Sequence, residues 1–294
     1  MISDISKNIL LWIDSMVFTP EEIALFINSL KKFSTYDFTD YSEKSFARRL
    51  DKISSDNKLD ANGLLNKMKN DSVFLEQVVR DITVNTTELF RDPDIWQAIR
   101  FRVLPRYESQ SVINIWHAGC STGQEVYSML ILLNEMGLYD KANVFATDIN
   151  TDVIDIAKKG VYKFRFNIDY LNNFDKVLKE NPYNYEDVAD VPYSKYFDID
   201  KAKDIITIKP FLTKKPLFRK QDLVRDGNIF YTKFDIILCR NVLIYFNHQL
   251  QNRIFEQYHQ NLFARGCLIL GVHESMLGPV ASKFKRKGIM YVKK

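Results

Sequence analysis

The chain has 294 residues with 41 lysines and arginines against 37 aspartates and glutamates, so its formal net charge at pH 7 is +4. That length allows two domains, or one large domain with an appendage, and so mild a charge does not call for a nucleic-acid partner. No apolar run approaches the ~20 residues that span a bilayer, so no membrane insertion is expected. Charged residues interrupt Met1–Phe18, which we therefore read as neither a signal peptide nor an anchor.

The cysteines and histidines indicate neither disulfides nor a metal. Cys120, Cys239 and Cys267 form no even set and no C-x-x-C pair, so we expect reduced thiols and a cytoplasmic protein. The four histidines lack the spacing of metal ligands, and no metal site is predicted.

Residues 1–84 are predicted to form an all-α N-terminal domain. Thr19-Pro20-Glu21-Glu22 is a capping box with proline at the first helical position. Further helices are expected at about 42–53, 62–68 and 72–84, separated by short runs of Asn, Asp and Ser.

The remainder, 85–294, changes to alternating strands and helices from about residue 111. The predicted strands are 112–116, 143–148, 217–221, 234–239 and 267–271, and the predicted helices between them are 125–136 and 152–159. This alternation predicts an α/β fold with a doubly wound, Rossmann-like, mainly parallel sheet. Residues 283–294 are expected to add an edge hairpin.

Residues 163–210 interrupt that alternation. They are rich in Tyr, Asn and Asp and contain a predicted hairpin of 196–200 and 205–209 around a Lys-Ala-Lys-Asp turn. We predict a small β insertion within the sheet domain.

The first strand-to-helix turn runs from Gly119 to Gly123 and lacks the middle glycine of a G-x-G-x-x-G dinucleotide motif. Glu125 follows in the first helical turn, where a carboxylate would repel a phosphate. A cationic adenosine ligand without phosphate, such as S-adenosylmethionine, fits these residues better. A purely structural turn, with Glu125 favoured by the helix dipole, is the alternative.

Two further strand ends carry polar residues. Asp148 ends the second strand, where an acid can accept both ribose hydroxyls, although it could instead cap the next helix in place of Asn150 or Thr151. Arg240-Asn241 follows a buried strand and precedes an apolar turn that contains Tyr245. Such residues face the ligand cleft in this architecture. A structural ion pair for Arg240 and a core position for Tyr245 are the alternatives.

Three segments together resemble the chemotaxis receptor methyltransferases, the CheR-type family. They are 85–92 (NTTELFRD), 118–128 (AGCSTGQEVYS) and 239–246 (CRNVLIYF), with support from 146–149 (ATDI) and 270–275 (LGVHES), all in the family's order. The resemblance covers nearly the whole chain, including the helical N-terminal domain and the β insertion. It implies a protein-glutamate O-methyltransferase that uses S-adenosylmethionine and releases S-adenosylhomocysteine.

Matched by position, the resemblance implies a donor site made of the following residues: Asn85, Thr87, Arg91, Gly119, Glu125, Asp148, Asp222, Leu223, Arg240 and Asn241. Asp222 and Leu223 would flank the adenine, with Asp222 standing where the family has asparagine. Leu89 stands where an aromatic is commoner in the family.

We expect Arg91, Tyr245 and Arg240 to serve catalysis. Arg91 and Tyr245 would hold the acceptor carboxylate, while Arg240 and Asn241 shape the cleft. Arg91 could instead pair with the donor's own carboxylate. A glutamate with a pKa near ~4.3 is already ionised at neutral pH, so no general base is required.

The expected partners are the acidic cytoplasmic helices of a chemoreceptor. Lys44, Arg48 and Lys52 recur at every fourth residue with Arg49 beside them, which predicts a positive helix face for docking, although such a face can be merely solvated. Members of the family that bind a receptor's C-terminal pentapeptide carry a glycine-rich loop in the β insertion. Residues 163–210 contain no glycine, so pentapeptide tethering is not expected. We expect a monomer.

Two other functions remain open from the sequence. A methyltransferase with another acceptor would share the donor site and differ in the N-terminal domain and the β insertion. A non-catalytic module that binds S-adenosylmethionine or S-adenosylhomocysteine would have no need of the acceptor residues. A nicotinamide-dependent oxidoreductase is disfavoured by the missing second glycine.

Overall fold

The computed structural model describes residues 18–83, 85–166 and 168–294. The chain divides into two compact units: a helical unit of the residues up to 84 with Ile244–Gln251, and a sheet unit of Asn85–Leu243 with Asn252–Lys294. The sequence had placed 244–251 with the sheet. The reading of residues 1–17 as neither signal nor anchor lies outside the described residues, and none of the described helices is long and apolar enough to cross a membrane.

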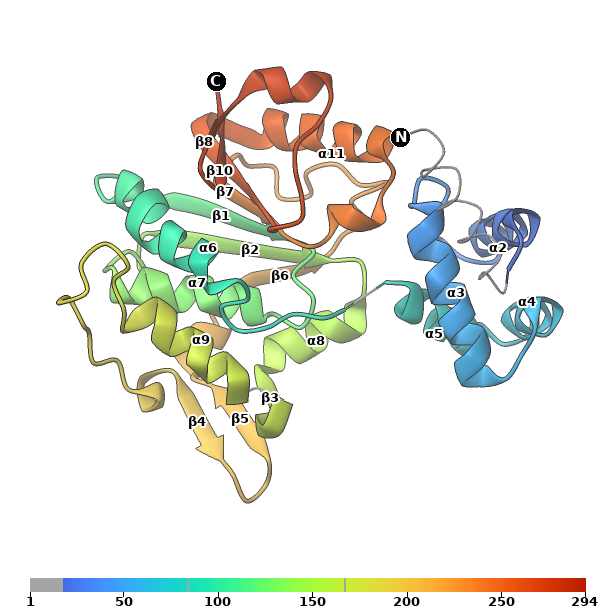
Figure 1. Ribbon diagram of the computed structural model, residues 1–294, viewed down its shortest axis with the longest axis horizontal. Helices are drawn as coiled ribbons and strands as arrows, with labels where there is room; N and C mark the ends of the chain where they lie inside the picture. The colour runs from blue at the N-terminus through green and yellow to red at the C-terminus, as the bar shows by residue number, and fades with distance from the viewer. Residues whose placement is uncertain (1–17, 84, 167) are drawn as a thin grey trace, which may run out of the picture. The chain divides into compact units, whose positions relative to one another are not determined.

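The helical unit contains four described helices, drawn in blue to cyan in Figure 1: α2 (Pro20–Phe33), α3 (Glu43–Asn57), α4 (Ala61–Asn70) and α5 (Ser72–Ile82). The capping box predicted for α2 is present, because the Thr19 hydroxyl accepts the Glu22 N–H and the Glu22 carboxylate accepts the Thr19 N–H. Asp60 and Asp71 cap α4 and α5 by a single bond each, because their side chains accept the N–H groups of Gly63 and Phe74. Local sequence signals therefore set most of the starts of these helices.

The segment Ile244–Gln251 completes the helical unit. Tyr41 and Phe246 form an isolated antiparallel bridge, and their rings meet edge to face with centroids 5.0 Å apart. Asn247 donates its N–H to the Asp40 carbonyl at 2.9 Å. Residues more than two hundred positions apart thus share one small core with Phe38, whose ring lies against that of Tyr41.

The sheet unit is built on a seven-stranded sheet of order β6-β2-β1-β7-β8-β10-β9. Its strands are β1 (Ile113–Ala118), β2 (Ala142–Asp148), β6 (Leu217–Lys220), β7 (Phe234–Cys239), β8 (Leu262–Leu270), β9 (Phe284–Lys287) and β10 (Met290–Lys293). The first five pair in parallel, and β10 and β9 add an antiparallel hairpin at one edge. The predicted doubly wound α/β sheet and its edge hairpin are confirmed.

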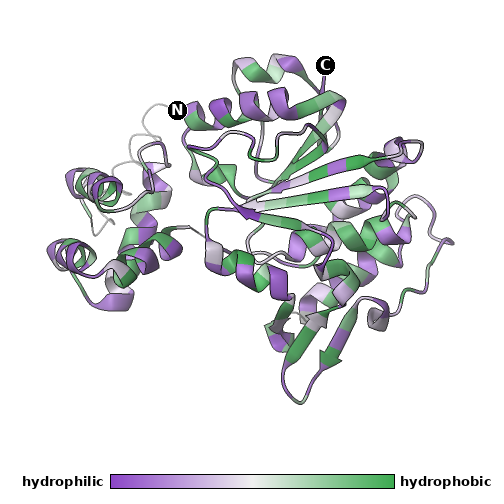
Figure 2. Ribbon diagram, turned by 180° about the vertical axis from the view of Figure 1, so that it is seen from behind, coloured by the Kyte–Doolittle hydropathy of each residue, from purple (hydrophilic) through white to green (hydrophobic). Residues whose placement is uncertain are grey.

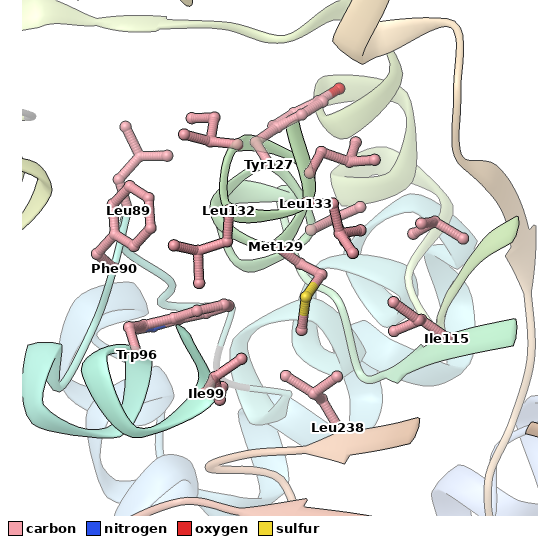
Figure 3. Close-up of a cluster of buried hydrophobic side chains, with 14 of the residues drawn as sticks. Leu89, Phe90, Trp96, Ile99, Ile115, Tyr127, Met129, Leu132, Leu133 and Leu238 are labelled. Carbon is pink, nitrogen blue, oxygen red and sulfur yellow. The ribbon is translucent and has the colours of Figure 1, made fainter. Parts of the chain in front are cut away.

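Helices cover both faces of this sheet. On one face lie α6 (Pro93–Ala98), the π-helical turn η1 (Ile99–Val103), α7 (Gln124–Glu135) and α8 (Thr151–Lys159). Figure 3 shows side chains of α7, of the segment 89–99 and of strands β1 and β7 gathered around Met129 and Leu132. On the other face, the ring of Tyr258 of α11 (His248–Asn261) packs against the ring of Trp116 of β1, with centroids 5.4 Å apart. Figure 2 shows hydrophilic and hydrophobic residues alternating around the helices. This pattern is expected for helices that pack one face on the sheet and expose the other to solvent.

The insertion after α8 contains the predicted hairpin and more. Its sheet has the order β3-β5-β4, with β3 (Val161–Lys163), β4 (Phe197–Asp200) and β5 (Ile205–Ile208). The sequence had not predicted β3 or the helix α9 (Ile168–Leu178), which packs beside α6. The β4–β5 turn takes φ +58° at Asp204, so an aspartate fills the left-handed position that a glycine would favour.

Shorter elements connect these parts. They are the 3-10 turns η2 (Leu104–Tyr107), η3 (Phe164–Phe166), η4 (Tyr193–Lys195), η5 (Leu243–Tyr245) and η6 (Pro279–Lys283), and the single turn α10 (Pro210–Thr213). The sequence had left 93–107 and 248–261 unassigned, and both are largely helical.

Candidate active site at the carboxyl edge of the sheet

The turn between β1 and α7 is shaped by positive backbone angles, with φ +80° at Gly119, +49° at Ser121 and +90° at Gly123. A Cβ on Gly119 would lie 2.5 Å from Val242 Cγ2, so the turn leaves no room for a side chain there. The N–H groups of Gly119 and Cys120 both donate to the Thr147 carbonyl at 2.8 Å. These backbone bonds tie the turn to the end of β2.

Asp148 joins the same two strand ends through its carboxylate. It is 8% exposed and accepts the Ser121 N–H at 2.8 Å and the Asn150 N–H at 3.0 Å, one on each oxygen. Burial raises the pKa of Asp148 above its usual range, against the opposing effect of these N–H groups. Asn150 caps α8 by accepting the Asp152 N–H, so the alternative role for Asp148 as the helix cap is excluded. A carboxylate has about four acceptor positions, so the backbone N–H groups of Ser121, Asn150 and Ile149 leave capacity for a further donor.

Glu125 is held between two cationic or proton-donating groups. The His117 Nδ1 lies 2.8 Å from its Oε1, and the Arg240 Nη1 lies 3.1 Å from its Oε2. An ionised carboxylate can only accept, so the imidazole donates in the first contact. Burial alone would raise the pKa of Glu125, but the bond from His117 and the charge of Arg240 outweigh it, and its pKa lies below its usual range. Glu125 is therefore anionic at neutral pH.

Arg240 lies at the centre of this network. Its side chain is 1% exposed, and its Nη2 donates to the Arg91 carbonyl at 2.7 Å and to the Asp92 carboxylate at 2.9 Å. Its guanidinium also lies 5.6 Å from the centroid of the Trp96 ring. The structural ion pair that the sequence left open as an alternative is therefore present, and it fixes the backbone at Arg91 as well as Glu125.

The segment that carries Arg91 runs past the glycine turn. The Asn85 carbonyl accepts the Ser121 hydroxyl at 3.0 Å, and Ser128 Oγ of α7 accepts the Phe90 N–H at 2.8 Å. Phe90 and Asp92 both take positive φ, +51° and +59°, so the backbone on either side of Arg91 is strained and held by its neighbours. The Arg91 side chain is half-buried and its Nη1 donates to the Thr86 carbonyl at 3.4 Å.

The other donor-site residues named from the sequence are placed as follows. Thr87 is half-buried beside Thr86, and Leu223 is 9% exposed just after β6. The Asp222 carboxylate accepts the Val224 N–H at 2.8 Å, and burial together with the charge of Asp226 raises its pKa. The N–H of Gln221 donates to the Asp148 carbonyl, which brings the ends of β6 and β2 together.

Tyr245 belongs to the segment grouped with the helical unit, where its carbonyl accepts the Ser42 N–H at 2.8 Å. Its contact with an acceptor stays a prediction. On α3, Lys44, Arg48 and Lys52 are exposed, and Arg49 is half-buried. Lys52 also pairs with Asp56 at 2.8 Å.

Three residues of the edge network were not singled out from the sequence: Asp92, His117 and Glu274. Glu274 accepts four backbone N–H groups, from Gly271, Asn241, Val242 and Leu243. Asp92 and Glu274 lie inside the quoted motifs 85–92 and 270–275, so motif membership was the available signal. In the described part of the chain, no group of three or more His, Cys, Asp or Glu side chains could hold a metal ion.

Comparison with known proteins adds to this geometry. The family model described as CheR methyltransferase, SAM binding domain, matches residues 85–174 and 176–291. A Pseudomonas putida protein named "Putative methyltransferase Cher3" is 34% identical over 259 residues, which are 88% of this chain and 90% of that protein. Proteins named chemotaxis protein methyltransferase are 28% identical in Listeria innocua, covering 86% of this chain and 90% of that one, and 31% identical in Vibrio anguillarum, covering 71% and 73%.

Proposed function

Since the chain belongs to the CheR family of S-adenosylmethionine-dependent methyltransferases, we propose that it methylates glutamate side chains on the cytoplasmic helices of a chemoreceptor. The products would be glutamate methyl esters and S-adenosylhomocysteine. Membership confirms the family that the motifs resemble, and with it the methyl donor. The acceptor is the proposed part. It is supported by relatives that are named chemotaxis protein methyltransferases, and the three free, buried cysteines fit a reaction in the cytoplasm.

The residues at the sheet edge fit the donor. Asp148 is buried and keeps capacity for a further donor, as a ribose partner requires, and Glu125 is anionic, as a partner for an ammonium group requires. The turn from Gly119 to Gly123 contains no lysine or arginine that could bind a phosphate. When bound, S-adenosylmethionine would supply an electrophilic methyl group on a sulfonium.

The observation that carries the acceptor proposal is a difference between two arginines. Arg240 has its charge balanced by Glu125 and Asp92, whereas among the described residues the Arg91 guanidinium donates to the Thr86 carbonyl and forms no ion pair. A guanidinium without a carboxylate partner attracts a carboxylate ligand. Arg91 is therefore the residue that we assign to an incoming carboxylate.

The chemistry asks little of the protein beyond placement. A glutamate is ionised at neutral pH, so the chain has to orient one carboxylate oxygen and remove its water rather than supply a base. Orientation of this kind contributes up to about 7–11 kcal/mol in intramolecular reactions. In our proposal Arg91 and Tyr245 orient the acceptor carboxylate, and Arg240 keeps the backbone of Arg91 in place.

Docking of the acceptor is assigned to α3. Lys44, Arg48 and Lys52 are exposed and recur on one face of the helix, which complements an acidic receptor helix. The ion pair of Lys52 with Asp56 is surface-exposed and weak, so it does not prevent an exchange of partners. The glycine-free insertion supports a direct encounter rather than pentapeptide tethering.

The decisive experiment uses labelled donor and cytoplasmic fragments of chemoreceptors. We expect label that base releases as methanol, because a glutamate methyl ester is base-labile. The matched control is the same fragment with its candidate glutamates changed to glutamine, which should take no label. Base-stable label, or no label on any receptor fragment although the donor binds, would refute the proposed acceptor.

Arg91→Ala tests the assignment of Arg91 to the acceptor carboxylate. Loss of a charge-assisted pair should lower the rate at saturating donor roughly 10- to 100-fold, given about 1.5–3 kcal/mol for such a bond. The same assay on Tyr245→Phe tests its hydroxyl. Unchanged rates for both variants would remove these residues from catalysis, and a weakened affinity of Arg91→Ala for S-adenosylhomocysteine would assign Arg91 to the donor's carboxylate instead.

A different acceptor is the second candidate. The observation in its favour is that the relative of 34% identity is named as a methyltransferase without mention of chemotaxis. Label on a small molecule or on a non-receptor protein, with none on receptor fragments, would favour it.

A further inference from the structure

The backbone that follows β7 turns around a carboxylate supplied by the next strand's loop. Asn241 takes φ +60°, and its N–H donates to Glu274 Oε2 at 2.7 Å. The next two N–H groups, of Val242 and Leu243, donate to Glu274 Oε1 at 2.9 and 2.8 Å. Successive amides around a left-handed residue form a concave anion site. Here the protein's own glutamate occupies that site.

Gly271 completes the arrangement from the end of β8. Its N–H donates to Glu274 Oε2 at 2.7 Å, and its carbonyl accepts the Glu274 N–H at 3.0 Å. A Cβ on Gly271 would lie 2.8 Å from Glu274 Oε2 and 3.0 Å from the Asn241 nitrogen. Because Gly271 has no side chain, the Glu274 carboxylate can lie against its backbone. Four backbone N–H groups from the ends of two neighbouring strands therefore donate to one carboxylate.

This amide cluster is linked to the donor turn on two sides. Val242 packs on Gly119 so closely that a Cβ there would lie 2.5 Å from its methyl group. Arg240, one residue before the cluster, pairs with Glu125. A shift of residues 240–243 would therefore move one wall of the glycine turn and a partner of Glu125 together.

We infer that Glu274 is a positioning residue of the donor site. Its carboxylate fixes the backbone of 241–243 and thereby the contact of Val242 with Gly119 and the approach of Asn241 to the donor. Glu274 acts through this backbone and touches no reacting atom. The inference rests on the proposed function only through donor binding, because its tests measure affinity for S-adenosylhomocysteine and need no acceptor.

The first test compares Glu274→Ala and Glu274→Gln with wild type by calorimetry with S-adenosylhomocysteine, well below each protein's melting temperature. We expect Glu274→Ala to bind at least roughly tenfold more weakly, since the lost bonds involve a charged acceptor. Glu274→Gln should fall between, because one amide oxygen still accepts while its NH₂ opposes the N–H groups. Glu256→Gln is the control, since Glu256 pairs with Lys283 at the surface and should leave affinity unchanged.

Hydrogen exchange gives a readout that identifies the mechanism. In Glu274→Ala the peptide containing residues 241–243 should lose amide protection, while peptides of β1 and α7 keep theirs. Gly271→Ala should also weaken donor affinity, because the added methyl group would displace the Glu274 carboxylate from the same cluster. Because both changes act on one carboxylate, their effects in the double variant should fall well short of the sum.

Wild-type affinity in Glu274→Ala, even with a lowered melting temperature, would overturn the inference by reducing Glu274 to a purely stabilising residue. Fully additive losses in the double variant would contradict it as well. Should the variants lose donor affinity as expected while no receptor fragment is methylated, the proposed acceptor fails and the role of Glu274 stands.

Discussion

The turn after β1 and the exit of β7 lie on adjacent strands and are fixed by different forces. The turn after β1 depends mainly on absent side chains: Gly119 and Gly123 have no room for a Cβ. Backbone bonds to the Thr147 carbonyl and one bond from the Ser121 N–H to the Asp148 carboxylate complete the turn. The exit of β7 depends on charge: Arg240 pairs with Glu125 and Asp92, and Glu274 gathers four amides.

The two regions are therefore vulnerable to different kinds of change. Close packing of backbone is intolerant of added volume. A buried charge network tolerates small changes of shape but loses much when one member is removed, because the partner is left without compensation. Substitutions should therefore separate the two regions.

The largest effect is expected for Arg240→Ala. It leaves Glu125 and Asp92 without their cation, and breaking a buried ion pair costs about 3–5 kcal/mol. Urea unfolding at pH 7 should show that loss, and donor affinity should fall with it. Arg240→Lys keeps the charge but cannot serve all three acceptors, so its loss should be smaller. Stability within 1 kcal/mol of wild type for the alanine variant would remove charge as the organising force of the β7 exit.

Gly119→Ala should rank second. The left-handed φ of +80° costs a non-glycine residue about 1–2 kcal/mol, and the overlap with Val242 adds about 1–3 kcal/mol. Gly137→Ala is the matched control, because Gly137 has φ +68° and nothing within 4 Å of an added Cβ. Calorimetric melting should show the larger loss at position 119. Equal losses at the two positions would mean that the contact with Val242 is unimportant.

Glu125→Gln should give the smallest loss, about 1.5–3 kcal/mol at pH 7 for bonds to a charged group. The pKa of Glu125 is lowered in the folded protein, so its contribution is complete above the unfolded value near 4.5 and is lost as pH falls through the folded value. The difference between wild type and Glu125→Gln in urea unfolding should therefore stay level from pH 7 to about 5 and shrink below that. A difference independent of pH down to 3.5 would show that charge is not its source.

Local signals were enough for much of the fold. The capping box at Thr19 set the start of α2, and the apolar run of residues 236–239 marked a strand with neighbours on both sides. The glycines of the β1 turn and the acid at Asp148 marked two strand ends, because their positions relative to the strands are local properties of the chain. Their distances and partners are not.

Other features could not be predicted because their partners are distant in sequence. Glu274 lies in the motif 270–275, but the motif does not reveal its role, because only the fold brings it to amides more than thirty residues away. The charge of Arg240 is likewise explained only by its contact with Glu125, which lies 115 positions earlier in the chain. The helix α9 lies in a region rich in Tyr, Asn and Asp, and it packs against α6, a contact that the local sequence does not reveal.

The bridge between Tyr41 and Phe246 has a consequence for synthesis. During translation the helices α2 to α5 emerge first, yet a strip of their core arrives only after roughly two hundred further residues. Tyr41 can pack against Phe246 only after the ribosome has synthesised that late segment. Because this contact closes a long loop, its formation slows the completion of folding. A fragment that ends near residue 84 would therefore lack the part of its core that Ile244–Gln251 supplies. Receptor-docking studies should for this reason use the full chain.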